Sequence, residues 1–599
     1  MKKCMASLCL SVCLSAFAYS QYSFTSPYLQ SPEKTIGYVD SCAQFWKKAY
    51  DPSAGGFYMN LNRQGRQIYS TGKNALNQSR DAYGFVRAFQ MTGKEEYLDY
   101  ARRALDFMYA SAWDYTYGGW RNDVSAAGKA TSPLSNKTAY YQHYALLGIT
   151  AYFEATRDTL DWEWLQKSYA YNEAKLWDAR AGSFGYYDNV RYDGTSASAK
   201  SFNATVDAVT THLLHLYLMT GDAAYKKRLL ELADNMIAHL YESSKSQKMG
   251  FAELYDQDWK IDNTSQNATR TIMGHVLKTS WCLARIYEIT PDTALLGTAR
   301  RLTELVWQKG YDHALGGPYK DYDRLTGAMM MYGNRDTCKA WWQMEQAITD
   351  GLMLYHVTGV PQYAQMADES LNFFMNYFVD HTYGDVYAER TRYGAIAWNN
   401  EDKGNDGKAG YHSIETGYYT YLYGNLLVKK RPTTLYYYFI PDVKEKQYAM
   451  NPVSCSDPSL VIASVTHDGA EYPLVDKAQR VITVPSGMGG SFAVTYAMSG
   501  VAAVNSDEAT APEGCSLAQN FPNPFNPSTV IRFRLDRERD VHVTVHDMLG
   551  REVAVLADGR YATGDHAVAW NASALPSGIY LYTIRAGAYH ETKKMILAR

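Results

Sequence analysis

Apolar side chains recur at helical spacing along residues 21–432, in runs such as 82–90, 97–108 and 213–219. A short polar corner separates successive runs, and in three places it reads Thr-Gly, at residues 92–93, 220–221 and 358–359. A glycine directly after an apolar run is typical of the end of a helix. The pattern therefore predicts pairs of helices joined by tight corners.

A second motif runs out of phase with the corners and combines an aspartate with glycines and, in most copies, an aromatic residue. Its copies begin at Asp51, Asp114, Asp178, Asp312 and Asp380. They lie about 65 residues apart, except for one interval of twice that length, in which the missing copy falls near residues 249–251. The glycines indicate the turn of a short hairpin. Each repeat is therefore predicted to hold two helices and one hairpin.

Six such repeats predict an all-α (α/α)6 toroid over residues 21–432. One helix pair cannot bury its apolar faces alone, so neighbouring pairs must stack. Near-equal units favour closure into a ring, with inner helices around a central cavity and the hairpins gathered at one end. An open helical solenoid is the alternative.

The composition changes to that of strands after residue 432. Residues 433–498 contain strand-like runs at 434–439, 459–465, 480–484 and 492–496, which predict a small β-sandwich domain. Residues 499–514, rich in Ala, Ser, Glu and Pro, predict a linker. Alternating strands return within residues 515–599. The predicted fold is thus a toroid followed by two small all-β, immunoglobulin-like domains.

Residues 515–599 also carry specific motifs. Three prolines punctuate the segment 519–529, Asp-Met-Leu-Gly-Arg-Glu-Val occupies 547–553, and Leu-Pro-Ser-Gly-Ile-Tyr-Leu-Tyr-Thr occupies 575–583. With Lys-Lys-Met at 593–595, this segment resembles the C-terminal sorting domain of type IX secretion cargo. The resemblance implies the type IX machinery as a partner, a Gram-negative host, and removal of the tail after export. An ordinary immunoglobulin-like appendage is the alternative.

The first 20 residues predict a secretory signal peptide. Two lysines precede an apolar run from Met5 to Ala18 that is too short to span a membrane. A lipid anchor at Cys13 is a weaker alternative because bulky Val12 precedes it. We find no later stretch that is long and apolar enough for a membrane span. A secreted or cell-surface location is expected.

The bulk composition narrows the possible partners. The 59 basic and 62 acidic residues nearly balance and form no basic stripe, which argues against nucleic acid. The 52 tyrosines can pack cores or line a sugar cleft. The five cysteines that follow the signal are scattered and show no metal-ligand spacing, so we expect no metal site.

Polar stretches mark the predicted starts of inner helices. Residues 73–80 end in Arg80, Gly-His occupies 274–275, and residues 408–412 end in His412. Trp-Trp-Gln-Met-Glu occupies 341–345. In a closed ring, all of them can point at one axial cavity. Taken alone, His275 is either a structural histidine or a proton-transfer group at a helix end.

These residues make 35–428 resemble the N-acylglucosamine 2-epimerase and cellobiose 2-epimerase superfamily. The markers that carry the resemblance are Arg80, Gly274-His275, Trp342 to Glu345 and Tyr411-His412. The acidic strand that contains Glu253 is also similar to the family. The resemblance implies a sugar epimerase or isomerase that acts on the reducing end of a mono- or oligosaccharide and needs no cofactor.

The resemblance also implies residue roles. Epimerisation at C2 removes a proton beside the aldehyde and returns it to the other face, which suits two histidines. Carried over, His275 and His412 are the acid/base pair, and Arg80 holds the enediolate. Glu345 would bind a sugar hydroxyl or orient a histidine, and the tryptophans would stack on sugar or pack in the core. The expected substrate-binding residues are Glu345, Trp341, Trp342, Asp207, Tyr411 and His143.

Two features depart from the family pattern. Lys278 stands where a glutamate is expected, and its ammonium would lower the pKa of His275 if the two lay close. The helix over 203–217 lacks the inward histidines of cellobiose epimerases, and Asp207 is its best inward polar residue. The identity of the sugar is therefore left open.

Three alternatives to an epimerase remain. An aldose–ketose isomerase differs only in where the enediolate is reprotonated. A glycoside hydrolase or polysaccharide lyase on the same toroid would use cavity carboxylates. The candidates for that role are Asp207, Glu253, Glu345 and Asp406. The last alternative is a non-catalytic carbohydrate-binding toroid.

Overall fold

The computed structural model describes residues 22–69, 72–265, 268–331, 333–452, 455–499, 516–517, 520, 523, 525–547, 551–587 and 589–597. The predicted signal peptide and nearly all of the predicted linker lie outside these residues. The chain divides into two compact units between residues 503 and 504. Each unit is described by itself.

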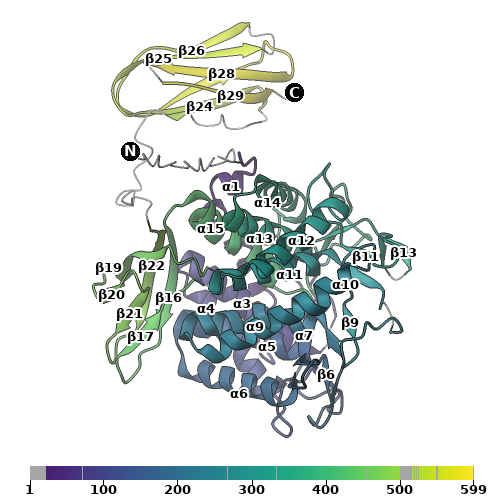
Figure 1. Ribbon diagram of the computed structural model, residues 1–599. Helices are drawn as coiled ribbons and strands as arrows, with labels where there is room; N and C mark the ends of the chain where they lie inside the picture. Colours follow the sequence, from purple (N-terminus) through teal and green to yellow (C-terminus); the bar gives the residue numbers. More distant parts are fainter. Residues whose placement is uncertain are drawn as a thin grey trace, which may run out of the picture. The chain divides into compact units, whose positions relative to one another are not determined.

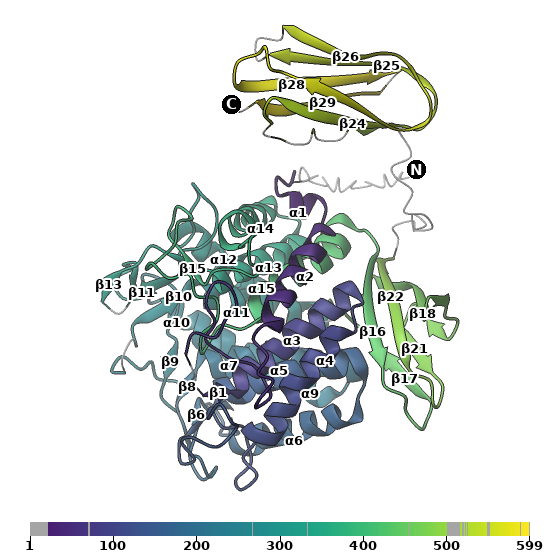
Figure 2. The ribbon, with the colours of Figure 1, turned by 180° about the vertical axis from the view of Figure 1, so that it is seen from behind.

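The first unit is built on a ring of inner helices (Figures 1 and 2). In the described residues these are α3 (Ala75–Thr92), α5 (Ala139–Thr156), α7 (Phe202–Ala208) continued through η2 (Val209–Leu213) into α8 (Leu214–Thr220), α11 (Met273–Ile289), α13 (Trp341–Thr358) and α15 (Tyr411–Tyr423). Each helix contacts the next, and α15 returns to contact α3. The ring is therefore closed, as predicted, and the open solenoid is wrong.

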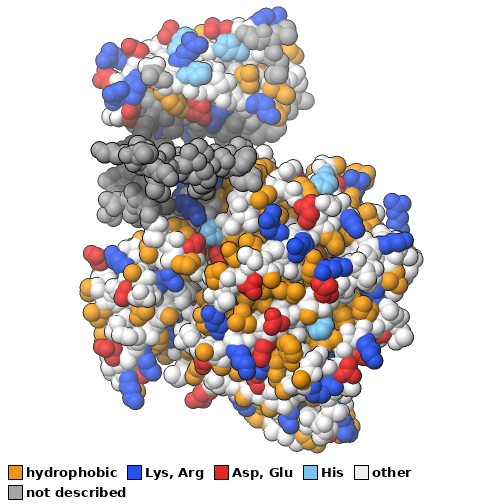
Figure 3. All heavy atoms as spheres, viewed as in Figure 1, with side chains coloured by type: hydrophobic (Ala, Val, Ile, Leu, Met, Phe, Trp, Pro, Cys, Tyr) orange, Lys and Arg blue, Asp and Glu red, His pale blue; other side chains and the backbone are white. Residues whose placement is uncertain are grey.

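Outer helices pack against the ring. They are α2 (Lys34–Lys47), α4 (Glu96–Phe107), α6 (Thr159–Lys175), α9 (Ala223–Asn235), α12 (Thr293–Lys309) and α14 (Pro361–Phe373). The Thr-Gly corners join inner to outer helices because Gly93, Gly221 and Gly359 adopt left-handed backbone, with φ of 70°, 69° and 69°. None of the described helices is long and apolar enough to cross a membrane. Basic and acidic side chains are mixed over the face seen in Figure 3.

Buried ion pairs of lysine and aspartate link the hairpins to the segments that lead into the inner helices. The ammonium of Lys73 lies 2.8 Å from Asp51 Oδ2 and donates to the Gly55 carbonyl at 2.6 Å. The same arrangement recurs in the pairs Lys137–Asp114, Lys200–Asp178, Lys339–Asp312 and Lys403–Asp380. The aspartates that mark the repeat in the sequence are thus one half of a buried ion pair.

Residues 433–498 belong to the same compact unit as the helices and share their hydrophobic core. One antiparallel sheet has the order β16 (Thr433–Phe439), β22 (Gly490–Met498), β18 (Leu460–His467) and β19 (Ala470–Glu471). A second has the order β17 (Lys446–Ala449), β21 (Val481–Val484) and β20 (Val475–Asp476). The segment is β-rich, as predicted, but its core is continuous with that of the toroid.

This β segment meets the C-terminal ends of the inner helices. Strand β16 packs on α3 and α5, and the Ile440 amide donates to the Thr156 carbonyl at 2.9 Å. Four further contacts reach α8, α11, α13 and α15: Asn451 to the Leu218 carbonyl, Ser456 to Glu288, His356 to Asp457, and Tyr421 to the Thr434 carbonyl. The segment therefore closes one end of the ring.

The second unit consists of two antiparallel sheets around its own core. One has the order β23 (Ser516–Leu517), β24 (Ser528–Leu535) and β27 (Gly564–Asn571). The other has the order β26 (Glu552–Tyr561), β25 (Arg539–Asp547), β28 (Gly578–Ala586) and β29 (Tyr589–Leu597). Alternate residues such as Val543, Tyr582 and Ile584 are buried between them. The immunoglobulin-like label stays a prediction.

Candidate active site

A cavity of about 530 Å³ lies among the N-terminal ends of the inner helices, at the ends of those helices away from the β segment. Its lining consists of Arg80, Thr138, Tyr140, Tyr141, Tyr144, Asp188, Asn203, Asp207, Leu254, His275, Lys278, Trp341, Trp342, Asn405, Gly407 and His412. The residues come from the six inner helices named above and the loops before them. The cavity thus brings together His275, His412 and Arg80, which the sequence separates by hundreds of positions.

His275 occupies the first turn of α11, as its sequence context predicts. Its Nδ1 lies 2.7 Å from Glu253 Oε2, and the other oxygen of Glu253 accepts the Ile272 amide at 3.0 Å. The Phe202 ring stacks on the imidazole, with centroids 3.7 Å apart. These contacts fix the ring and leave Nε2 as the nitrogen for a ligand.

His412 is the second residue of α15, and its ring is also backed by carboxylates. Its Nδ1 lies 3.4 Å from Glu345 Oε2 and 3.9 Å from Glu415 Oε2. The Tyr83 hydroxyl donates to Glu415 at 2.7 Å. Both histidines therefore turn Nδ1 towards a carboxylate and keep Nε2 for the cavity.

The charges around His412 favour its neutral form. Burial lowers its pKa well below the ordinary value, and the charges of Arg80 and Lys278 lower it further. Burial also raises the pKa of both Glu345 and Glu415, and the negative charge of Glu415 adds to the effect on Glu345. Two buried carboxylates so close together resist simultaneous ionisation. A neutral imidazole can accept a proton at physiological pH.

Arg80 is a buried cation with unusual partners. It donates to the Tyr140 hydroxyl at 3.0 Å and to the Gly407 carbonyl, and its guanidinium lies 4.2 Å from the centre of the Tyr144 ring. Within the described part of the chain, no carboxylate lies within ion-pair distance of Arg80. A buried cation without a counter-charge is costly, so the site is prepared for negative charge on a ligand.

The Trp342 ring lies close to both histidines. Its ring centroid lies 5.2 Å from that of His275 and 6.1 Å from that of His412. Trp341 lies 6.3 Å from His412. Both indoles line the cavity, where a flat apolar surface suits one face of a sugar ring.

Lys278 forms a buried ion pair with an aspartate. Its ammonium lies 2.6 Å from Asp207 Oδ1 and 3.2 Å from the Tyr144 hydroxyl. Asn203 donates to the other oxygen of Asp207 at 2.9 Å. The carboxylate partner of His275 is Glu253, which directly precedes the strand β9 (Leu254–Tyr255).

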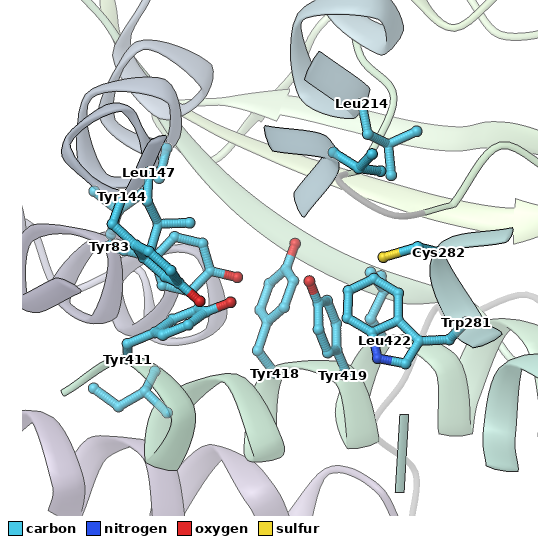
Figure 4. Packing of buried hydrophobic residues seen from close by; sticks show 14 of the residues in the cluster. Tyr83, Tyr144, Leu147, Leu214, Trp281, Cys282, Tyr411, Tyr418, Tyr419 and Leu422 are labelled. Atoms are coloured by element: carbon cyan, nitrogen blue, oxygen red, sulfur yellow. The ribbon is translucent and has the colours of Figure 1, made fainter. Parts of the chain in front are cut away.

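Three expected substrate-binding residues do not line the cavity. Glu345 is buried behind His412, so of its two predicted roles the structure supports orientation of a histidine. Tyr411 is buried against Tyr83, with ring centroids 5.0 Å apart, and Figure 4 shows both beside Tyr144. His143 is wholly buried, and its ring stacks on that of His212 at 5.6 Å. That face of α5 packs on η2 instead of facing the cavity.

Other lining residues were missed by the sequence reasoning. Tyr140 and Tyr144 stand four positions apart at the start of α5, so they lie on the same face of an inner helix. This spacing was a signal in the sequence that both side chains could face the cavity. Asp188, Asn405 and Gly407 lie outside the helices, where no period marks which side chains face the cavity.

Two clusters of the described residues have imidazole and carboxylate atoms within 4.8 Å of one another: Glu345, His412 and Glu415, and Glu288, His356 and Asp457. In the first cluster, Tyr83 and Thr349 donate to the Oε1 atoms of Glu415 and Glu345, and the Oε2 atoms of both carboxylates face His412. In the second cluster, His356 bridges both carboxylates, at 3.3 and 2.9 Å. We assign neither as a metal centre.

The helix pairs form a closed ring, and one end of it holds two imidazoles, a buried guanidinium and two indoles. These features define an (α/α)6 protein with a cavity suited to sugar chemistry. The chain belongs to the N-acylglucosamine 2-epimerase (GlcNAc 2-epimerase) family, whose model matches residues 56–416. This membership places it among the carbohydrate epimerase and isomerase enzymes.

Curated relatives share the catalytic unit at low identity. A cellobiose 2-epimerase of Bacteroides fragilis is 21% identical over 389 residues, which cover 62% of this chain and 93% of the relative. A D-mannose isomerase of Marinomonas mediterranea is 23% identical over 397 residues, which cover 64% and 94%. The similarity thus spans nearly the whole length of both relatives.

Solved structures show the same fold. A D-mannose isomerase aligns with a TM-score of 0.59 at 20% identity and covers 66% of this chain and 99% of its own. A cellobiose 2-epimerase from Bacillus thermoamylovorans aligns with a TM-score of 0.56 at 16% identity, covering 65% and 99%. Residues 519–598 match the secretion system C-terminal sorting domain, which indicates type IX export and an extracellular or surface location.

Proposed function

We propose that the protein is an exported sugar 2-epimerase or aldose–ketose isomerase that moves a proton beside the carbonyl carbon through an enediolate. The observation that carries the proposal is the shared cavity of His275, His412 and Arg80. Each imidazole turns Nδ1 towards a carboxylate, which leaves Nε2 for the substrate.

His412 is the better candidate for the base. Its pKa lies well below the ordinary value, so the ring is neutral and can take the proton from C2. His275, oriented by Glu253, would return a proton to the same carbon from the other side or to the neighbouring carbon. The first outcome is epimerisation and the second is isomerisation.

Arg80 would stabilise the enediolate. Its guanidinium is buried in the cavity wall without a carboxylate partner among the described residues, so it gains a counter-charge only when a sugar oxygen becomes negative. A fixed charge that needs no rearrangement is worth more in the transition state than in the ground state.

The carboxylates of the cavity make a hydrolase the weaker candidate. Asp207 is bound by Lys278 and Asn203, and Asp188 accepts hydrogen bonds from Ser201 and Asn189. A hydrolase needs one carboxyl group to donate a proton and a second to act as base or nucleophile. The two carboxylates of the lining are instead hydrogen-bonded to neighbouring side chains.

A second cavity supports a substrate larger than one sugar ring. It has a volume of about 480 Å³ and shares Trp341 and Asn405 with the first. Trp398, which is 62% exposed, lies on its wall. There is room for a second sugar ring beside the reacting one, so we propose the reducing end of a mono- or oligosaccharide as substrate.

Export would use residues 1–20 as the signal peptide and remove the C-terminal tail.

The test is proton exchange in D₂O, followed by NMR on candidate monosaccharides and disaccharides. Deuterium at C2 with an inverted product supports epimerisation, and a ketose supports isomerisation. His275→Ala and His412→Ala should each abolish the exchange, whereas His313→Ala, at an exposed hairpin, should not. Absence of exchange with every sugar, or new reducing ends released from a polysaccharide, would overturn the proposal.

A further inference from the structure

Lys278 is a buried lysine on the wall of the cavity, one helical turn after His275. An ammonium has three N–H donors. Within the described residues, the structure gives this ammonium two acceptors, Asp207 Oδ1 at 2.6 Å and the Tyr144 hydroxyl at 3.2 Å. One N–H is therefore left for a ligand in the cavity.

Lys278 and Arg80 lie on the same side of the cavity because both contact Tyr144. The ammonium binds the hydroxyl of this tyrosine, and the guanidinium covers its ring at 4.2 Å. Asp207 anchors the ammonium and is itself held by Asn203. The geometry is that of a fixed charge on a rigid support, which is what stabilisation of a developing anion requires.

We propose that Lys278 is a second catalytic cation, whose free N–H donates to the sugar oxygen that becomes negative as the C2 proton leaves. The inference rests on the proposed function. In the step, the C2–H bond breaks and its proton passes to an imidazole Nε2. The electron pair of that bond forms the C1=C2 bond, and the carbonyl pair moves onto O1. The proton later returns from an imidazolium, so the step needs no other reactant.

The competing explanation is a purely structural ion pair, and kinetics separate the two. Lys278→Met should lower kcat by about 10²–10³-fold with little change in KM, because the lost hydrogen bond is strongest in the transition state. Lys278→Arg keeps the charge and should retain more of the activity. Lys227→Met, on an exposed part of α9, is the matched control and should leave kcat unchanged.

A pH profile is a second readout, which reports the charge that Lys278 places near His412. His412 is surrounded by Arg80 from α3, Lys278 and His275 from α11, Glu345 from α13, Glu415 from its own helix and Lys408 from the preceding loop. Removal of one cation makes protonation of His412 easier. The acidic limb of the kcat/KM profile should therefore move to higher pH in Lys278→Met and stay in place in Lys278→Arg.

Melting curves identify any variant that has lost its fold. If Lys278→Met unfolds, the double variant Lys278→Met/Asp207→Asn removes both charges of the pair and should fold, with the same loss of kcat. Either variant, folded and with kcat within threefold of the wild type and an unmoved acidic limb, overturns the inference and leaves the proposed function intact. A wild type that exchanges no C2 proton overturns the proposed function, and the inference with it.

Discussion

Glu253→Gln tests how the structure prepares His275 for proton transfer. The carboxylate makes two contacts: Oε2 lies 2.7 Å from Nδ1 of His275, and Oε1 accepts the Ile272 amide at 3.0 Å. A glutamine has the same shape, and its carbonyl can still accept the Ile272 amide. Its NH₂ group, however, can only donate to Nδ1, so it favours the tautomer that carries the proton on Nε2.

The expected loss follows from this inversion. In the proposed mechanism His275 returns the proton as an imidazolium, and without Glu253 this imidazolium loses its counter-charge and meets an N–H donor at Nδ1. With its proton held on Nε2, the neutral ring also cannot take up a new proton on the cavity side. Loss of the carboxylate that holds a catalytic histidine costs about 10²–10⁴-fold in kcat, equivalent to about 3–5 kcal/mol in the barrier. The free energy of unfolding should change little, because the Ile272 hydrogen bond survives.

The assay is C2 deuterium exchange with the best sugar substrate, together with thermal unfolding. Asp256→Asn, an exposed aspartate three positions later, is the control and should keep the wild-type rate. A folded Glu253→Gln protein with kcat/KM within threefold of the wild type would falsify this account of His275.

Three other predictions concern charge. Arg80→Met should reduce kcat about 10²–10³-fold in the exchange assay, and an unchanged rate would remove Arg80 from the mechanism. Lys73→Met leaves the buried Asp51 without its cation and should lower the free energy of unfolding by about 3–5 kcal/mol in urea titration; a change below about 1 kcal/mol would contradict the role of the buried pair. His356→Gln should lower Tm more at pH 5.5 than at pH 9. The carboxylates of Asp457 and Glu288 raise the pKa of His356, and the pKa of Asp457 is lowered to about 2. The ion pair is thus complete between about pH 4 and 6.5 and is lost as pH rises through the raised pKa. Equal losses at both pH values would contradict it.

The amino-acid sequence by itself determined the helix pairs, their number and the closed ring. Helices and turns are local features, because the spacing of apolar residues and the identity of the turn residues determine them within a few positions. Repetition of one helix-pair unit then favours closure of the ring. The sequence also placed His275 and His412 in the first turns of inner helices. The motifs of the sorting domain were likewise sufficient, since they lie within one short segment.

Tertiary structure decided which side chains reach the cavity. Successive residues of a helix point about 100° apart, so packing against two neighbours determines whether a residue faces the axis or a helix contact. That choice put Tyr144 in the cavity wall and His143, one position earlier, against η2. It also gave Lys278 to Asp207 and Glu253 to His275. Partners of this kind lie on different elements, and no local pattern records which of them will meet.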